Sequence, residues 1–316
     1  MIEGVNQSGG TRSGTGWLPV IAGGLALGLA AWVLPASAVR AETNIIGTVS
    51  TYVTDHDDTL LDVARKFDLG FVELVAANPG VDPWLPGEGV TLVLPTAHIL
   101  PDAPRRGLVV NLTEMRLYYY RRPGEEPETH PVGIGSEGMN TPVATTTIVR
   151  KQANPTWYVP ASIRAEKPEL PAVVPPGPNN PMGLYALYLG FSSGNVRIHG
   201  TNEPFAVGRR VTHGCMRLYP EDIEDMFHKV EPGTPVTFVD TAIKVAWQDG
   251  ELYMEVHPSK AQADELEEEH RMTEEPAEGA VELATKVAGE DQGRLDIPTI
   301  QRVAVERRGY PVRITQ

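Results

Sequence analysis

A chain of 316 residues is long enough for roughly two or three domains, and 41% hydrophobic with 22% charged residues is the composition of a folded protein. These values exclude a wholly disordered chain and a polytopic membrane protein. Lys and Arg total 27 against 41 Asp and Glu, and a net charge of −14 argues against nucleic-acid binding.

The N-terminal segment carries features of an export signal. Residues 17–34 form an apolar run inside a stretch without charged residues. Two small-x-small sites follow, Ala36-Ser37-Ala38 and Val39-Arg40-Ala41, of the kind that a signal peptidase cuts. Residues 1–41 are therefore predicted to be a signal peptide. An uncleaved N-terminal membrane anchor is the alternative, because the run is nearly long enough to span a bilayer. Both interpretations export the rest of the chain.

Residues 42–97 predict a small unit with the order strand, helix, helix, strand. An extended start covers residues 48–53, and the acidic pair Asp57-Asp58 precedes apolar residues that recur every three to four positions. This pattern predicts a helix that begins near Asp58. A second helix is predicted over residues 71–77 and a returning strand over residues 90–94.

This unit resembles a LysM module, a small fold that binds glycan chains containing N-acetylglucosamine. The resemblance rests on Asp57-Asp58-Thr59-Leu60, on Ala76-Ala77-Asn78-Pro79 and on the segment from Leu85-Pro86-Gly87 to Pro95. Asp57 stands where that family usually has glycine. Residues 98–106, which prolines interrupt, are predicted to be a linker.

Residues 107–240 predict a mainly β region with one helix. Strand-favouring residues such as Tyr118-Tyr119-Tyr120 recur in short runs. The helix, residues 220–230, opens with acidic residues and closes with basic ones, as the helix dipole favours. Strands are predicted at 108–112, 115–121, 129–134, 145–151, 184–189, 195–199 and 235–239.

Residues 241–316 predict a C-terminal hairpin and an acidic extension. Strands over 242–247 and 252–256 flank the hairpin turn Asp249-Gly250. Residues 251–291 hold 13 acidic and three basic residues, and 261–291 contain few apolar ones. We therefore expect a solvated helix or a flexible extension there. Residues 297–314 regain enough apolar residues to dock on the body.

Cys215 is the only cysteine, so it cannot form a disulfide within the chain. A thiol with an ordinary pKa of about 8.5 needs a neighbouring base to act as a nucleophile, and His199 lies 16 positions upstream. Gly214 lets a substrate carbonyl approach the backbone, where the N–H groups of Gly214 and Cys215 can bind an oxyanion. The pattern predicts a Cys–His pair for covalent catalysis.

Each of these residues also has a plainer interpretation. Cys215 could be a small buried apolar residue, His199 could hold a loop, and Arg217 could pair with Glu221 or Asp222. Two histidines and a cysteine also match the ligand types of a catalytic zinc. Their spacing and the lack of a fourth ligand argue against a metal site.

The string Thr212-His213-Gly214-Cys215, preceded by His199, resembles the signature of L,D-transpeptidases with the YkuD-type catalytic domain. Further stretches are similar to the periplasmic ErfK/YbiS branch of that family. The resemblance implies a β-rich YkuD-like fold, a periplasmic location and no cofactor. These stretches are Ile99-Leu100-Pro101-Asp102, Glu114-Met115-Arg116-Leu117, Pro131-Val132-Gly133-Ile134-Gly135 and Asn180-Pro181-Met182-Gly183-Leu184-Tyr185.

The resemblance also implies a mechanism on peptidoglycan stem peptides. Cys215 would attack the carbonyl of meso-diaminopimelate, the third residue of a tetrapeptide stem, and release D-alanine. His199 would accept the thiol proton while the Gly200 carbonyl orients its ring, and His213 would support the oxyanion together with backbone N–H groups. The implied substrate-binding residues are Arg217, Gly200, Thr212, Met182 and Tyr185.

The acceptor of the resulting thioester is predicted from the branch alone. That branch typically uses the C-terminal lysine amine of the abundant outer-membrane lipoprotein. The alternatives are a second stem, which gives 3→3 cross-links, or water, which makes the protein a hydrolase. A peptidoglycan-binding protein with an inert thiol is a further alternative. The family resemblance also implies inhibition by carbapenem-type β-lactams.

Overall fold

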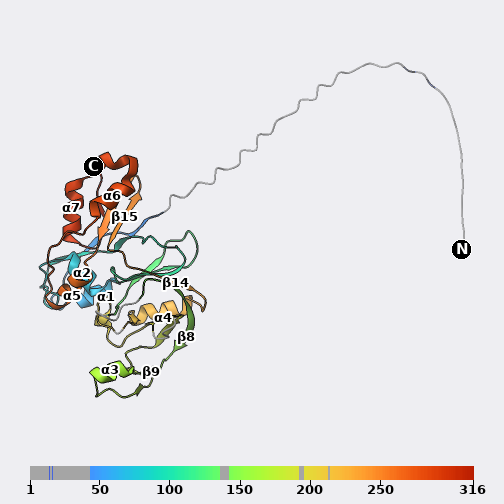
Figure 1. Cartoon of the computed structure of the whole chain (residues 1–316), viewed down its shortest axis with the longest axis vertical. Coiled ribbons are helices and arrows are strands. Elements are labelled where there is room, and N and C mark those ends of the chain that lie inside the picture. The colour runs from blue at the N-terminus through green and yellow to red at the C-terminus, as the bar shows by residue number, and fades with distance from the viewer. Residues whose placement is uncertain (1–13, 15, 17–42, 136–141, 192–195, 213) are drawn as a thin grey trace. The chain divides into compact units, whose positions relative to one another are not determined.

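An eight-stranded sheet dominates the computed structural model, which describes residues 14, 16, 43–135, 142–191, 196–212 and 214–316 (Figure 1). The fold below is that of the unit spanning residues 42–316. The predicted signal peptide, residues 1–41, lies outside the described residues apart from positions 14 and 16. Among the residues that are described, no helix combines the length and the apolar character needed to cross a membrane.

The large sheet has the strand order β13-β12-β11-β8-β14-β5-β6-β7. A bridge between Gly133, just after β7, and Arg217 on β13 joins the two ends, so the sheet curls on itself. The mainly β fold predicted from sequence is confirmed. The strands are β5 (Gly107–Asn111), β6 (Arg116–Tyr120), β7 (Glu128–Pro131), β8 (Thr145–Ala153), β11 (Tyr185–Leu189), β12 (Arg197–His199), β13 (Met216–Arg217) and β14 (Pro235–Val239).

The N-terminal unit contains the predicted strand, helix, helix and strand as β2 (Ser50–Val53), α1 (Leu60–Lys66), α2 (Phe71–Ala77) and β3 (Thr91–Leu94), together with an outer pair of strands, β1 (Ile45–Gly47) and β4 (Ala97–Ile99), that was not predicted. Strand β2 pairs with β3, and β1 pairs with β4. Between them lie α1 and α2. Helix α1 begins at Leu60 because the Thr59 side chain accepts a hydrogen bond from the Asp62 N–H and caps the helix.

One hydrophobic core joins this unit to the large sheet. Leu60 and Phe71 from the helices lie in the same buried cluster as Leu108 and Leu117 from the sheet. Helix α4 (Pro220–Lys229), where the charge pattern predicts a helix, contributes Ile223 to that cluster. The N-terminal unit and the sheet therefore stabilise each other.

Residues 154–184 leave the sheet between β8 and β11, and the sequence predicts no element over residues 154–183. They form β9 (Trp157–Tyr158), α3 (Ala161–Glu166) and β10 (Val173–Val174), and Figure 1 shows α3 and β9 at the bottom of the view. The buried Asn180 ties the base of this segment together. Its Nδ2 donates to the Pro155 carbonyl at 2.9 Å, and its Oδ1 accepts from the Met182 N–H at 2.9 Å.

The C-terminal part forms a second core. The sheet β15 (Ile243–Gln248), β16 (Glu251–Val256) and β17 (Val312–Arg313) packs against α6 (Ala280–Ala288) and α7 (Ile297–Glu306). Helix α5 (Lys260–Glu268) packs on α2 and buries Ala263 and Leu266. The expectation of a solvated helix or flexible extension over 261–291 is therefore wrong, because α5 and α6 each bury one face.

Candidate active site

Two neighbouring parallel strands, β12 and β13, position the predicted catalytic pair. Their register pairs Ile198 with Met216 and His199 with Arg217. Extending this register by one residue places Cys215 beside Arg197. Residues two apart on a strand share a face, and strand spacing and rise place the Cα atoms of His199 and Cys215 roughly 8 Å apart. Both residues line one cavity of about 610 Å³. Their side chains therefore face the same space.

His199 is buried and held in one orientation. Its Nδ1 lies 2.6 Å from the carbonyl oxygen of Gly200, which is the contact that the sequence predicts. Because a carbonyl only accepts, Nδ1 carries the hydrogen and Nε2 keeps its lone pair. Burial and the positive charge of Arg217 lower the pKa of His199 to about 3. The imidazole is therefore neutral near pH 7 and can accept a proton.

Cys215 is half-buried at the entrance to β13. Burial raises the pKa of its thiol, and the positive charge and hydrogen bonds of Arg197 oppose that shift. Arg197 also lines the cavity and was not predicted from sequence. The signal that could have found it is its position two residues before His199, on the same face of the same strand.

The loop before Cys215 has a backbone that requires glycine. Gly214 has a φ of 93°, in the region that side chains with a Cβ rarely adopt. The buried Thr212 donates from Oγ1 to the Cys215 carbonyl at 2.6 Å and also lines the cavity. His213, predicted to support the oxyanion, lies outside the described residues.

Arg217 lines the cavity next to Cys215. Burial lowers the pKa of its guanidinium, and its carboxylate partner is Glu203, with Nη1 and Oε2 3.8 Å apart. Glu221 and Asp222, the partners considered from sequence, form ion pairs elsewhere. Arg217 therefore pairs with a carboxylate, as that interpretation expected, but with Glu203 rather than with Glu221 or Asp222.

Of the two candidates near β11, the structure places only Met182 at the cavity. Met182 is buried and lines it. Tyr185 instead packs on α4, where its ring lies 4.7 Å from that of Phe227 and its hydroxyl donates to Glu224 at 3.3 Å. Alternation along β11 puts Tyr185 on the opposite face from Ala186, the register partner of His199. Tyr185 therefore does not line the cavity that contains Cys215.

Acidic residues of α5 hold the loop that connects His199 to Cys215. Glu267 accepts from the Arg210 N–H at 2.6 Å and from the Arg209 side chain at 3.2 Å. Asp264 lies 3.3 Å from the Arg210 guanidinium. Part of the acidic run therefore forms specific ion pairs with this loop, which composition alone did not reveal.

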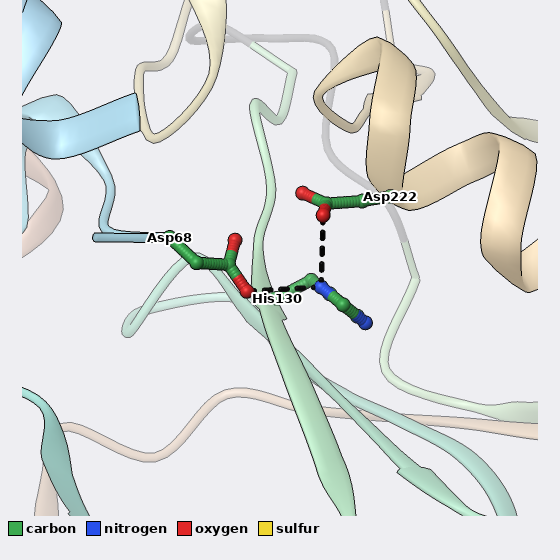
Figure 2. Close-up of side chains that lie close together, drawn as sticks. All are labelled: Asp68, His130 and Asp222. Atoms are coloured by element: carbon green, nitrogen blue, oxygen red, sulfur yellow. Dashed lines mark hydrogen bonds and ion pairs between the residues drawn. The ribbon is translucent and has the colours of Figure 1, made fainter. Parts of the chain in front are cut away.

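Two other groups of titratable side chains lie close together in the described part of the chain. His130 on β7 faces Asp68 at 3.0 Å and Asp222 at 3.3 Å, and so joins the N-terminal unit to α4 (Figure 2). In the second, Lys244 places its ammonium 2.9 Å from Glu114 and 2.8 Å from Glu255. Neither group includes the residues predicted for catalysis.

The comparisons with known proteins agree on one family. Residues 105–238 match YkuD, the L,D-transpeptidase catalytic domain. The chain is 39% identical over 291 residues to the Probable L,D-transpeptidase YcfS of Escherichia coli K12, a match that covers 89% of this chain and 87% of the relative. It is 42% identical over 257 residues to the Probable L,D-transpeptidase YbiS of the same strain, covering 79% and 81%.

A third relative is the Probable L,D-transpeptidase ErfK/SrfK of Salmonella typhimurium LT2. It is 39% identical over 282 residues, which cover 86% of this chain and 88% of the relative. Among solved structures, the catalytic domain from an E. faecium L,D-transpeptidase acylated by ertapenem is 20% identical, with a TM-score of 0.33. That match covers 42% of this chain and 96% of the other.

Proposed function

This chain belongs to the L,D-transpeptidase family and is a cysteine acyltransferase, and we propose that Cys215 is its nucleophile and His199 its general base. The observation that carries the proposal is that both residues line one cavity while Gly200 fixes the ring of His199. A neutral imidazole with Nε2 unprotonated fits the role of proton acceptor.

The donor half-reaction follows from these groups. Nε2 of His199 takes the proton from Sγ as the sulfur attacks the carbonyl carbon of diaminopimelate in a tetrapeptide stem. The C–N bond to D-alanine breaks, His199 returns the proton to the leaving amine, and a thioester remains on Cys215. The raised thiol pKa means that sulfur and imidazole are both neutral before the substrate binds. Proton transfer therefore accompanies the attack.

The developing oxyanion needs donors close to the sulfur. We assign this role to backbone N–H groups around Gly214 and Cys215 and, as the family resemblance implies, to His213. The positive φ of Gly214 supports this assignment, because a loop that turns there can aim successive N–H groups at one point. Removing one oxyanion donor typically costs about 10²–10³ in rate.

The acceptor that resolves the thioester is proposed to be the C-terminal lysine amine of the outer-membrane lipoprotein. The support is the similarity to the ErfK and YbiS relatives over most of the chain. The lysine amine attacks the thioester carbonyl, His199 takes its proton, and the thiol returns on Cys215. Transfer to a second stem or to water proceeds from the same thioester and gives different products.

One experiment tests both halves of this proposal. The purified chain is given a defined tetrapeptide donor together with a lysine-terminated lipoprotein peptide and a second stem in equal amounts, and the products are identified by mass. The proposal predicts release of D-alanine and an amide to the lysine peptide. A 3→3 dimer or a free tripeptide as the main product refutes the acceptor. No D-alanine release by the wild-type chain refutes the reaction, and release that persists in Cys215→Ser refutes the nucleophile.

A carbapenem provides an independent probe of the thiol. We propose that Cys215 opens the β-lactam ring and retains the ring-opened product as a thioester. Intact mass should show one adduct in the wild-type chain and none in Cys215→Ala. An adduct that persists in the variant would assign the reaction to another residue.

We propose that residues 42–97 bind the glycan of peptidoglycan as a LysM-like module. We also propose that the protein acts in the periplasm after export. Leu85 and Trp84 lie exposed in this unit, at 81% and 47%, where they can contact a ligand. Because the unit shares its core with the sheet, point variants are better tests than deletion. Leu85→Ser should reduce cosedimentation with sacculi, whereas equal cosedimentation would contradict a glycan site there.

A further inference from the structure

A row of three side chains crosses the sheet beside the catalytic cysteine. The strand registers pair Arg150 on β8 with Tyr188 on β11, and Tyr188 with Arg197 on β12. Arg150 stacks on the Tyr188 ring with its Cζ 3.5 Å from the centroid, and the Cζ of Arg197 lies 5.1 Å from the same centroid. Cys215 follows Arg197 in this row, on the neighbouring strand. Arg150, Tyr188 and Arg197 therefore lie in a line across three neighbouring strands, with Arg197 next to the strand that carries Cys215.

The row lines a small cavity next to the catalytic one. Arg150, Tyr188 and Arg197 border a space of about 180 Å³. Trp157, Met182 and Arg197 line both this space and the cavity that contains Cys215. A ligand that reaches the thiol can therefore extend one of its groups into the smaller cavity.

The described lining of these two cavities is cationic in an acidic protein. It includes Arg150, Arg197 and Arg217 and contains no Asp or Glu, although the whole chain carries a net charge of −14. Arg197 Nε is buried and has no hydrogen-bond partner among the described residues. Arg150 donates to the neutral Gln152 at 2.5 Å. Arg150 and Arg197 are held without a carboxylate from the described part of the protein, unlike Arg217, which pairs with Glu203. Such guanidinium groups favour an anionic ligand.

We propose that Arg150, Tyr188 and Arg197 form a subsite that binds a carboxylate of the donor stem. The inference rests on the proposed function, because the two stem residues joined by the bond that breaks each carry a free carboxylate. One belongs to the terminal D-alanine and the other is the free carboxylate of diaminopimelate. Arg197 is one strand from Cys215, roughly 5 Å away, so its side chain reaches groups a few bonds from the reacting carbon. The subsite recruits an anionic stem to a protein whose overall charge repels it.

Equilibrium binding to the full chain carrying Cys215→Ala tests the subsite without turnover. The ligand is a defined tetrapeptide stem, and the measurement is its dissociation constant by calorimetry. Adding Arg150→Gln should weaken binding at least about tenfold, the effect of losing one charge-assisted hydrogen bond. Arg122→Gln is the matched control, because Arg122 is 67% exposed and pairs with Glu125 away from both cavities.

Two amidated stems identify which carboxylate is bound. One stem ends in D-alaninamide, and the other carries a carboxamide on diaminopimelate. For the contacted carboxylate, amidation weakens binding to the Cys215→Ala chain, and Arg150→Gln then has little further effect. For the other carboxylate, Arg150→Gln weakens binding of the amidated stem as much as that of the native one.

The results separate this inference from the proposed function. The subsite is refuted if Arg150→Gln and Arg122→Gln bind the native stem equally. It is also refuted if Arg150→Gln weakens the binding of both amidated stems as much as that of the native stem. Either result holds whatever reaction the wild-type chain catalyses. If the wild-type chain releases no D-alanine while binding still depends on Arg150 and on one carboxylate, the proposed reaction fails and the subsite stands. Melting temperatures confirm that both variants are folded.

Discussion

The buried ion pair between Glu73 and Arg116 gives a quantitative test of how the N-terminal unit is attached to the sheet. Glu73 on α2 and Arg116 on β6 have side chains that are 6% and 2% exposed, with Oε2 and Nη2 2.6 Å apart. Glu73 also accepts from the Gly70 N–H at 2.9 Å. Burial raises the pKa of Glu73, and the charge of Arg116 opposes that shift. Glu73→Gln would leave a buried guanidinium without its counter-charge.

The expected cost follows from the burial of both partners. Removing one partner of a buried pair typically costs about 3–5 kcal/mol, whereas replacing both by apolar residues is often close to neutral. For a unit of this size each kcal/mol lowers the melting temperature by about 2–4 °C. Glu73→Gln should therefore lower it by about 6–20 °C, and the double variant Glu73→Leu with Arg116→Met should recover most of the loss.

Thermal unfolding of the full chain followed by circular dichroism measures the effect. Glu221→Gln is the control, since Glu221 and its partner Arg65 are 52% and 45% exposed. An exposed pair is worth about 0–1 kcal/mol, so the control should shift the melting temperature by only a few degrees. If Glu73→Gln shifts it no further than the control, the pair does not hold the unit to the sheet.

Three further predictions concern the cluster of His130, Asp68 and Asp222, residues 154–184, and the loop before Cys215. Burial alone would lower the pKa of His130, but hydrogen bonds to Asp222 and Asp68 raise it to about 9. In the unfolded chain the pKa of His130 is about 6.5, so the stability that the protonated ring contributes is lost as the pH rises from about 6.5 toward 9. Over this pH range the melting temperature of the wild-type chain should fall more steeply than that of His130→Gln. Equal slopes would contradict this. Asn180→Ala leaves buried backbone groups unpaired and should speed hydrogen exchange in residues 154–184, so unchanged exchange there would show that Asn180 is dispensable. Gly214→Ala puts a Cβ on a residue with a φ of 93°, which costs about 1–2 kcal/mol. Carbapenem acylation of Cys215 should therefore slow about tenfold or more, while the dichroism spectrum stays native. Acylation at the wild-type rate would show that glycine is not required.

The elements with strong local signals were predictable from sequence. Helix α4 lies within one residue of its predicted end because acidic residues open it and basic residues close it. The strand β14 (Pro235–Val239) matches its predicted range. The short parallel strand β13 was missed because its pairing with β12 depends on a distant part of the chain.

Helices with small or polar buried faces were not predictable. Helix α6 buries Ala280, Ala284 and Ala288, which recur every four residues but contribute little hydrophobic signal. Helix α5 buries Gln262, whose side chain accepts from the Ser259 N–H and closes a capping box. Their stability comes from tertiary contacts that composition does not reveal.

The candidate site shows the same division. Cys215, His199 and Gly200 could be named because the motif carries their chemistry, whereas Arg197 depends on strand register. The sequence placed Tyr185 in the cavity, but alternation along β11 turns it toward α4. A motif identifies reacting groups, and register decides which other side chains surround them.

The rate of Cys215 acylation by a defined tetrapeptide stem, followed by intact mass in the wild-type chain and in His199→Ala, tests the central claim most directly. We predict that the wild-type chain gains a tripeptide acyl group on Cys215 as D-alanine is released, and that the rate in His199→Ala falls by at least about a hundredfold. Acylation of His199→Ala at the wild-type rate, or an acyl group on any residue other than Cys215, would contradict the claim.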